Sequence, residues 1–207
     1  MTKDKLRILG IAGSLRPGSY TRQAVKIALQ GAAEKGAATR LIDLREYELP
    51  FCNGDHDQAA RYSDAVRLQK DVAAAQGIIL GTPDYHGSFS GVLKNALDLM
   101  GFDEFGGKVV GLVGVSGGAM GAVNALNDLR KVGRSLHAWV VPQQAAVPRA
   151  SIHFDADGSL DNLDYEIRLK DVGRQVARFS YLVSSRETLR FLELWESAIP
   201  NPGGEDR

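Results

Sequence analysis

The chain has 207 residues, and its 25 Lys and Arg side chains equal its 25 Asp and Glu side chains in number. Because the charges balance, the chain lacks the strong net electrostatic field that attracts nucleic acid or a membrane surface. We therefore expect a small-molecule partner. Cys52 is the only cysteine, which excludes an internal disulfide and a cysteine-based zinc cluster and is typical of a cytoplasmic protein.

No apolar run is long enough to span a bilayer, and the short one near the N-terminus merges into a glycine loop, unlike a signal peptide. No group of histidines has metal-ligand spacing, so no metal site is expected. We predict a single domain over residues 1–200, followed by a disordered tail over residues 201–207 that contains Pro202 and two glycines.

Short apolar runs alternate with helical periodicity along most of the chain. The predicted strands are residues 6–12, 38–44, 77–80, 109–115 and 137–141, the last stopped by Pro142. Helices are predicted from Tyr20 to near Gly36 and around residues 65–73, 92–100, 122–129, 169–183 and 189–195, with an irregular loop at residues 50–60.

Strand and helix alternate five times, which predicts a doubly wound α/β fold with a parallel sheet and helices on both faces. Three loops follow strand ends, at residues 13–19, 82–90 and 116–119. Because the carboxyl ends of parallel strands meet at one edge, where ligands bind in open α/β sheets, these loops are expected to form one site.

The first loop and the helix start after it carry no acidic side chain, since no Asp or Glu occurs between Asp4 and Glu34. Helix first turns normally favour carboxylates, because the dipole and the unpaired N–H groups attract negative charge. This loop offers the hydroxyls of Ser14 and Ser19 and the guanidinium of Arg16 instead. The pattern favours a phosphate group supplied by a ligand.

An ordinary strand-to-helix turn also explains this glycine and proline content. Residues 13–19 match neither the Walker loop nor the G-x-G-x-x-G dinucleotide pattern.

The second loop combines a proline, two flat side chains and a glycine that permits close approach of a planar ring. Its backbone could pair with the polar edge of a heterocycle. The alternative is a capped turn in which Tyr85 and His86 only cover the sheet edge.

The third loop matches the G-x-S-x-G pattern of serine hydrolases at residues 114–118. Ser116 would be the nucleophile, with Asp128 and either His137 or His153 downstream. A hydrolase needs its acid and base on late strands of a larger sheet, and only one further strand is predicted. We therefore favour a loop whose N–H groups face a ligand ring over a hydrolase.

Together the three loops resemble the NADPH-dependent FMN reductase family, a flavodoxin-like group that includes bacterial chromate and quinone reductases and azoreductases. The matches occur in the family's order and span roughly residues 6–145. They are Gly13-Ser14-Leu15-Arg16 with Ser19, then Pro83-Asp84-Tyr85-His86-Gly87-Ser88 leading into Gly91-Val92-Leu93-Lys94-Asn95-Ala96-Leu97-Asp98, then Ser116-Gly117-Gly118 with Gly121.

The resemblance implies a five-stranded flavodoxin-like sheet in the order 2-1-3-4-5. By analogy, the first loop binds the FMN phosphate, the second borders the isoalloxazine ring and the third contacts its pyrimidine side. No catalytic side chain is implied, because flavin N5 carries the hydride, while Tyr85 and His86 shape the substrate face. The implied cofactor-binding residues are Ser14, Arg16, Ser19, Tyr20, Thr21, Pro83, Asp84, Tyr85, His86, Gly87, Ser116, Gly117 and Gly118.

Two positions depart from the family pattern. Thr21 stands where an Asn is common near the phosphate, and His86 stands where Asn usually lies beside the flavin. Neither change removes a backbone group. Because family members are usually dimers or tetramers, a homodimer or homotetramer is implied.

The function implied is hydride transfer from NADPH or NADH to FMN and on to a quinone, free flavin or similar acceptor, with ping-pong kinetics. A flavin-binding electron carrier or redox sensor without nicotinamide turnover is the alternative. A serine hydrolase that uses Ser116 is the third and least favoured hypothesis.

Overall fold

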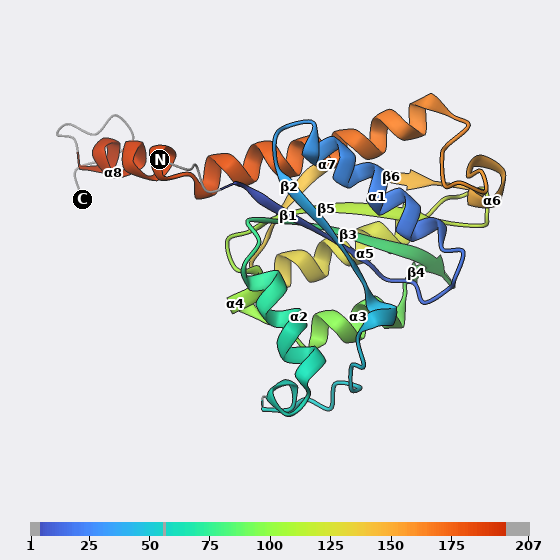
Figure 1. Cartoon of the computed structure of the whole chain (residues 1–207), viewed down its shortest axis with the longest axis horizontal. Helices are drawn as coiled ribbons and strands as arrows, with labels where there is room; N and C mark the ends of the chain where they lie inside the picture. The colour runs from blue at the N-terminus through green and yellow to red at the C-terminus, as the bar shows by residue number, and fades with distance from the viewer. Residues whose placement is uncertain (1–4, 56, 198–207) are drawn as a thin grey trace.

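Five parallel strands and one short antiparallel strand form the central sheet of the computed structural model, which describes residues 5–55 and 57–197 (Figure 1). Parallel strands run in the order β2-β1-β3-β5-β6, and β4 pairs with β3 outside this path. The strands are β1 (Arg7–Ala12), β2 (Ala38–Asp43), β3 (Gly77–Tyr85), β4 (Ser88–Phe89), β5 (Val109–Val115) and β6 (Trp139–Val147).

Eight α-helices are present within the described residues. They are α1 (Tyr20–Ala33), α2 (Ser63–Ala73), α3 (Gly91–Asp98), α4 (Phe102–Phe105), α5 (Val123–Ser135), α6 (Ala150–His153), α7 (Leu163–Ser184) and α8 (Arg186–Glu196). None of the described helices is long and apolar enough to cross a membrane. The tail predicted at residues 201–207 lies outside the described residues.

The central strands bury both faces, because adjacent residues in them are apolar and point to opposite sides. In β3, Ile79 packs into one core, whereas Ile78 and Leu80 pack into the other. Strand β1 pairs in parallel with β2 on one side and with β3 on the other. This arrangement explains why the middle strands were recognisable as continuous apolar runs.

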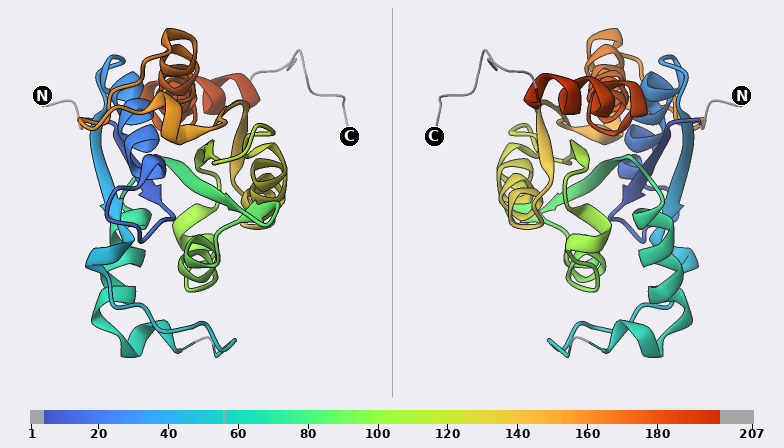
Figure 2. Two further views of the ribbon diagram at one scale, coloured as in Figure 1. Left: turned by 90° about the vertical axis from the view of Figure 1, so that its right-hand side faces the viewer. Right: turned by 90° about the vertical axis from the view of Figure 1, so that its left-hand side faces the viewer.

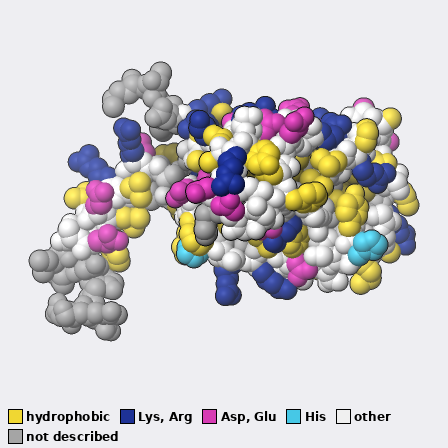
Figure 3. All heavy atoms as spheres, turned by 90° about the horizontal axis from the view of Figure 1, so that it is seen from below, with side chains coloured by type: hydrophobic (Ala, Val, Ile, Leu, Met, Phe, Trp, Pro, Cys, Tyr) yellow, Lys and Arg dark blue, Asp and Glu magenta, His cyan; other side chains and the backbone are white. Residues whose placement is uncertain are grey.

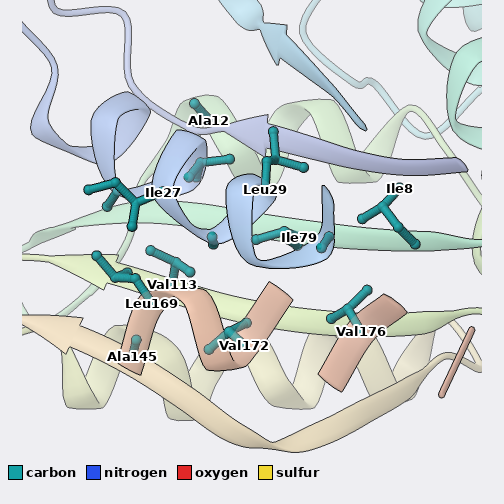
Figure 4. Close-up of a cluster of buried hydrophobic side chains, with 14 of the residues drawn as sticks. Ile8, Ala12, Ile27, Leu29, Ile79, Val113, Ala145, Leu169, Val172 and Val176 are labelled. Carbon is teal, nitrogen blue, oxygen red and sulfur yellow. The ribbon is translucent and has the colours of Figure 1, made fainter. Parts of the chain in front are cut away.

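Helices α1 and α7 cover one face of the sheet, and their apolar side chains fill the core drawn in Figure 4. Their backbones touch closely at Gly173, where an added Cβ would overlap the carbonyl oxygen of Ala28. Helices α2, α3, α4 and α5 contribute to the core on the opposite face, so the sheet lies between two helical layers (Figure 2).

The prediction of five strands is wrong, because the sheet has six. Part of the segment predicted as a loop at residues 82–90 is a hairpin: β3 continues to Tyr85, and the short strand β4 folds back on it. The pairing joins Asp84 to Phe89 and Tyr85 to Ser88. Two residues are too few to give a strand pattern, which explains the omission.

The last strand does not stop at Pro142 but continues to Val147. Its pairing with β5 is irregular here: Val140 pairs with Val110, whereas Gln144 pairs with Leu112. Pro142 lies in this bulge of an edge strand, where its missing N–H group breaks no regular ladder bond.

Helix α5 begins at Val123, within one residue of the helix predicted around residues 122–129, and continues to Ser135. The connecting segment contains Gly121 at φ 66°. Left-handed backbone there keeps the loop outside the helix.

Candidate active site

A pocket of about 310 Å³ lies at the carboxyl edge of β1, β3 and β5. It is lined by Ser14, Arg16, Ser19, Tyr20, Thr21, Pro83, Asp84, Tyr85, Val115, Ser116, Gly117, Ala150 and Ser151. All three predicted loops therefore reach one pocket. The predicted site residues His86, Gly87 and Gly118 do not line it, whereas Val115, Ala150 and Ser151 do and were not predicted.

The first loop presents buried hydroxyls and one exposed cation. Ser14 and Ser19 are each only 3% exposed. Ser19 caps α1 by accepting a hydrogen bond from the N–H of Arg22, and the first turn of α1 contains no acidic residue. The exposed Arg16 guanidinium forms no ion pair within the described residues. This end of α1 has the polarity that an anion requires.

Arg22 fixes the shape of this loop from within the protein. Its Nη2 donates to the carbonyl oxygen of Arg16 at 3.2 Å and also to that of Pro17. Its Nη1 lies 3.3 Å from the carboxylate of Asp43. The loop's own carbonyl groups are thereby turned toward a buried guanidinium.

Asp43 is shared between two arginines. Its carboxylate accepts hydrogen bonds from Arg45, including one of 2.6 Å from Nη2. The hydrogen bonds from Arg45, supported by the positive charge of Arg22, lower the pKa of Asp43 below its ordinary value. Asp43 therefore stays ionised at neutral pH and balances the buried charge of Arg22.

The first two loops are tied together by Ser90. Its hydroxyl donates to the carbonyl oxygen of Gly13 at 2.6 Å and caps α3 by accepting from Leu93 N–H. The N–H of Gly13 in turn donates to the carbonyl oxygen of Gly81 in β3. These bonds fix the distance between the phosphate-binding candidate loop and the hairpin.

The β3–β4 hairpin turns through His86 and Gly87, whose φ angles are 57° and 85°. Asp84 accepts a hydrogen bond from Gly87 N–H, and Ser88 donates to Asp128 of α5. Tyr85 is 46% exposed at the pocket and is free to contact a ligand ring. The hairpin is thus anchored on both sides, while its aromatic side chain remains open.

The third loop is held by the segment that follows β6. Arg149 N–H donates to the carbonyl oxygen of Gly118, and Ala150 N–H donates to that of Ser116. Gly118 N–H donates to the Ser116 hydroxyl at 2.9 Å. Of the two amides expected to meet a flavin, the one on Gly118 is therefore engaged, whereas Gly117 lines the pocket.

The hydrolase arrangement is absent from the described residues. The His153 ring pairs with Asp161, and the His137 ring stacks on Phe102 at a centroid distance of 4.3 Å. Asp128 binds Ser88 and Lys131 rather than a histidine. With no histidine hydrogen-bonded to Ser116 in the described part of the chain, a general base for this hydroxyl is lacking.

Tyr20 and Thr21, two predicted site residues at the start of α1, line the pocket and also pack within the protein. Tyr20 stacks on Phe154 with ring centroids 5.4 Å apart. Thr21 is 1% exposed. Stacking restricts the half-buried Tyr20 side chain, and burial restricts that of Thr21.

Besides Val115, which ends a predicted strand, sequence reasoning missed Arg22, Ser90, Ala150 and Ser151. Ser90 had a readable signal, because a serine directly before an apolar helical stripe is a typical N-cap. The other three reach the pocket or its loop only through tertiary packing, and no local pattern identifies them.

The residues of the chain match the family model described as NADPH-dependent FMN reductase over residues 6–151. The chain belongs to this family. It is therefore an NAD(P)H-dependent oxidoreductase of the FMN-using class. A curated relative, the FMN-dependent NADPH-azoreductase of Staphylococcus aureus (strain USA300), is 33% identical over 176 residues, which cover 82% of this chain and 92% of the relative.

Solved structures share the flavodoxin-like fold. The NAD(P)H:(acceptor) oxidoreductase FerB from Paracoccus denitrificans aligns with a TM-score of 0.72 at 23% identity, covering 86% of this chain and 98% of FerB. The apo form of an NADH:FMN oxidoreductase (EMOB) aligns with a TM-score of 0.65 at 24% identity, covering 90% of this chain and 94% of that one.

Proposed function

We propose that the chain is an NAD(P)H-dependent FMN reductase that passes electrons to a quinone, free flavin or azo compound in a ping-pong cycle. The observation that carries this proposal is the pocket in which an acid-free helix start, an aromatic hairpin and a glycine loop meet. Azo compounds are included because the Staphylococcus aureus relative is named for their reduction.

The pocket residues fit FMN. A phosphate needs donors and positive charge. The hydroxyls of Ser14 and Ser19, the N-terminus of α1 and the exposed guanidinium of Arg16 supply them together. The pocket volume of about 310 Å³ is within the range of small-molecule sites.

FMN, when bound, supplies the hydride chemistry, and the protein supplies binding and electrostatics. Arg16 neutralises the phosphate charge with geometry suited to two oxygens. Gly117 lines the pocket, and its N–H would donate to the polar edge of the ring, where a preorganised donor stabilises negative charge.

Tyr85 borders the open side of the pocket in this proposal. Tyr85 offers a flat, half-exposed surface to a planar donor or acceptor. His86 itself does not line the pocket, so its contribution is to fix the turn that presents Tyr85.

The test begins with the visible absorption spectrum of the purified chain and a titration with FMN. NADPH is then added to the FMN-loaded protein under anaerobic conditions, followed by a quinone. We expect the flavin absorbance to fall on the first addition and to return on the second. Parallel double-reciprocal plots would support the ping-pong cycle, and intersecting plots would exclude it.

Persistence of the oxidised spectrum after NADPH and NADH addition would favour the electron carrier or sensor. Colourless protein that hydrolyses esters, with activity lost in Ser116→Ala, would favour the hydrolase. We also propose a cytoplasmic homodimer or homotetramer, on the composition and the family resemblance.

A further inference from the structure

Helix α8 is amphipathic but buries none of its residues. Its large apolar side chains are 38–65% exposed, and the helix extends from the body of the molecule (Figures 1 and 3). These side chains are Leu189, Phe191, Leu192, Leu194 and Trp195.

The exposed apolar surface continues onto the last turns of α7, at Phe179, Tyr181, Leu182 and Val183. An isolated helix of 11 residues is only marginally stable in water, so packing normally supplies its stability. Within the described residues α8 packs mainly on α7. The apolar face of this arm, defined as residues 186–196, therefore lacks a partner in the described part of its own chain.

A cavity of about 1290 Å³ lies between the start of this arm and the body, at the opposite end of the sheet from the FMN pocket candidate. Its charged lining consists of Arg186 and Glu187 at the start of the arm itself and of four positive side chains from the body, Lys5, Arg7, Lys35 and Arg178. None of these four enters a salt bridge within residues 5–55 and 57–197.

The arm carries three glutamates, Glu187, Glu193 and Glu196, and two arginines, Arg186 and Arg190, so its net charge is opposite in sign to that of the cavity lining. Glu193 and Glu196 are exposed on α8, and neither forms a salt bridge with another described residue. The opposite net charges of the arm and the cavity lining favour contact between them.

We propose that a second copy of this chain fills the cavity with its own arm, and that the exchange is reciprocal about a twofold axis. Each arm then covers its apolar face against the partner's α7, and its glutamates meet the partner's basic cavity. A twofold arrangement satisfies both cavities with a single contact type and leaves no unpaired arm. This inference rests on the proposed homo-oligomer and identifies its contact surface.

The experiment uses the full chain and two charge-reversal variants. The arm variant is Glu193→Lys/Glu196→Lys, and the cavity variant is Lys35→Glu/Arg178→Glu. Both sets of side chains are exposed, so folding is expected to be unaffected. Sedimentation velocity and native mass spectrometry measure the dimer fraction. A control variant, Lys26→Glu/Arg134→Glu, places the charge change of the cavity variant on exposed positions elsewhere.

We expect each variant alone to have a dimer dissociation constant at least about tenfold above that of the wild type. An equimolar mixture should form a heterodimer with near wild-type affinity, because one contact is native and the other has both charges exchanged. The control variant should dimerise normally.

Three results would overturn the proposal. A wild-type chain that is monomeric would exclude both the homo-oligomer and the proposed contact surface. The same conclusion would follow if the monomer bound anionic vesicles through its arm. An oligomer indifferent to both reversals would leave the homo-oligomer but place its interface elsewhere. Monomeric variants that fail to associate on mixing would exclude reciprocal exchange. FMN reduction by NADPH tests the proposed function separately.

Discussion

Arg22 of α1 and Asp43 at the end of β2 form a buried ion pair, with 3.3 Å between Nη1 and Oδ2. The pair joins the candidate phosphate loop to the neighbouring strand, because the same guanidinium also binds the carbonyl groups of Arg16 and Pro17. Nη1 has no hydrogen bond of good geometry within the described residues. Electrostatic attraction, rather than a directional hydrogen bond, therefore stabilises its contact with Asp43.

Replacing Arg22 with Met should raise the FMN dissociation constant about tenfold, because the loop loses its preorganised shape. The unfolding free energy should fall by about 2 kcal/mol. FMN titration is performed at a temperature where circular dichroism shows a folded variant. Arg45→Met is the control, since it also removes a partner of Asp43 but does not contact the loop. Equal FMN affinity in wild type and Arg22→Met would contradict a positioning role.

Arg16→Ala should weaken FMN binding tenfold or more, since a charge-assisted contact contributes about 1.5–3 kcal/mol. Because Arg16 is exposed and unpaired among the described residues, its loss should leave the unfolding free energy nearly unchanged. Riboflavin, which lacks the phosphate, is the matched control ligand. A similar loss for riboflavin and FMN would show that Arg16 does not contact the phosphate.

The order of the main elements was predictable because both-face burial makes a parallel strand a continuous apolar run, as in Val109–Val115. The strand ends then located the site, since loops after parallel strands meet at one edge. Features of two to four residues, such as β4 and α4, carry too little periodicity to be recognised. The role of Arg22 depends on the approach of a distant strand, which no local pattern encodes.

The bulge at Pro142 shows a different limit. Proline normally ends a strand, and the prediction followed that rule. On an edge strand the missing donor can be tolerated, and the ladder resumes at Gln144. Whether a proline ends a strand therefore depends on the position of that strand within the sheet. This position follows only from the assembled fold.

His86→Asn should stabilise the protein by up to about 1 kcal/mol, because His86 holds a left-handed backbone of φ 57° that Asn adopts more readily. The urea midpoint measures this change. Gly87→Ala is the opposite control, since φ 85° at this position is costly for a residue with a Cβ. If His86→Asn were destabilising, the ring of His86 would have a stabilising contact that outweighs the turn.

Gly173→Ala should destabilise the protein by about 2 kcal/mol or more, because its Cβ would overlap the Ala28 carbonyl and push α7 away from α1. Chemical denaturation provides the measurement. Gly91→Ala is a matched control at the first residue of α3, where an added Cβ meets no atom within 4 Å. Equal stability of the two variants would mean that the α1–α7 contact relaxes without cost.

Lys108 gives a pH-dependent prediction far from the pocket. Its Nζ donates to the carbonyl oxygens of Val72 and Ala73 at the end of α2, and burial lowers its pKa from 10.5 to about 8. Between about pH 8 and pH 10.5 the unfolded chain holds this proton more often than the folded one, so folding stability rises with pH there.

Lys108→Met should remove the rise in folding stability between about pH 8 and pH 10.5. It should also lower the unfolding free energy by about 1 kcal/mol at alkaline pH, because the neutral amine of the wild type still donates hydrogen bonds to the carbonyl groups at the end of α2. The unfolding free energies of wild type and variant are measured by urea unfolding at about pH 7.5 and about pH 9.5. Because both proteins contain the same tyrosines and cysteine, the titration of those groups cancels in the comparison. The gap in unfolding free energy between wild type and variant should widen in favour of the wild type at the higher pH. A gap that stays constant or narrows would show that Lys108 titrates alike in the folded and unfolded chains, or is stabilised as the cation by the helix end.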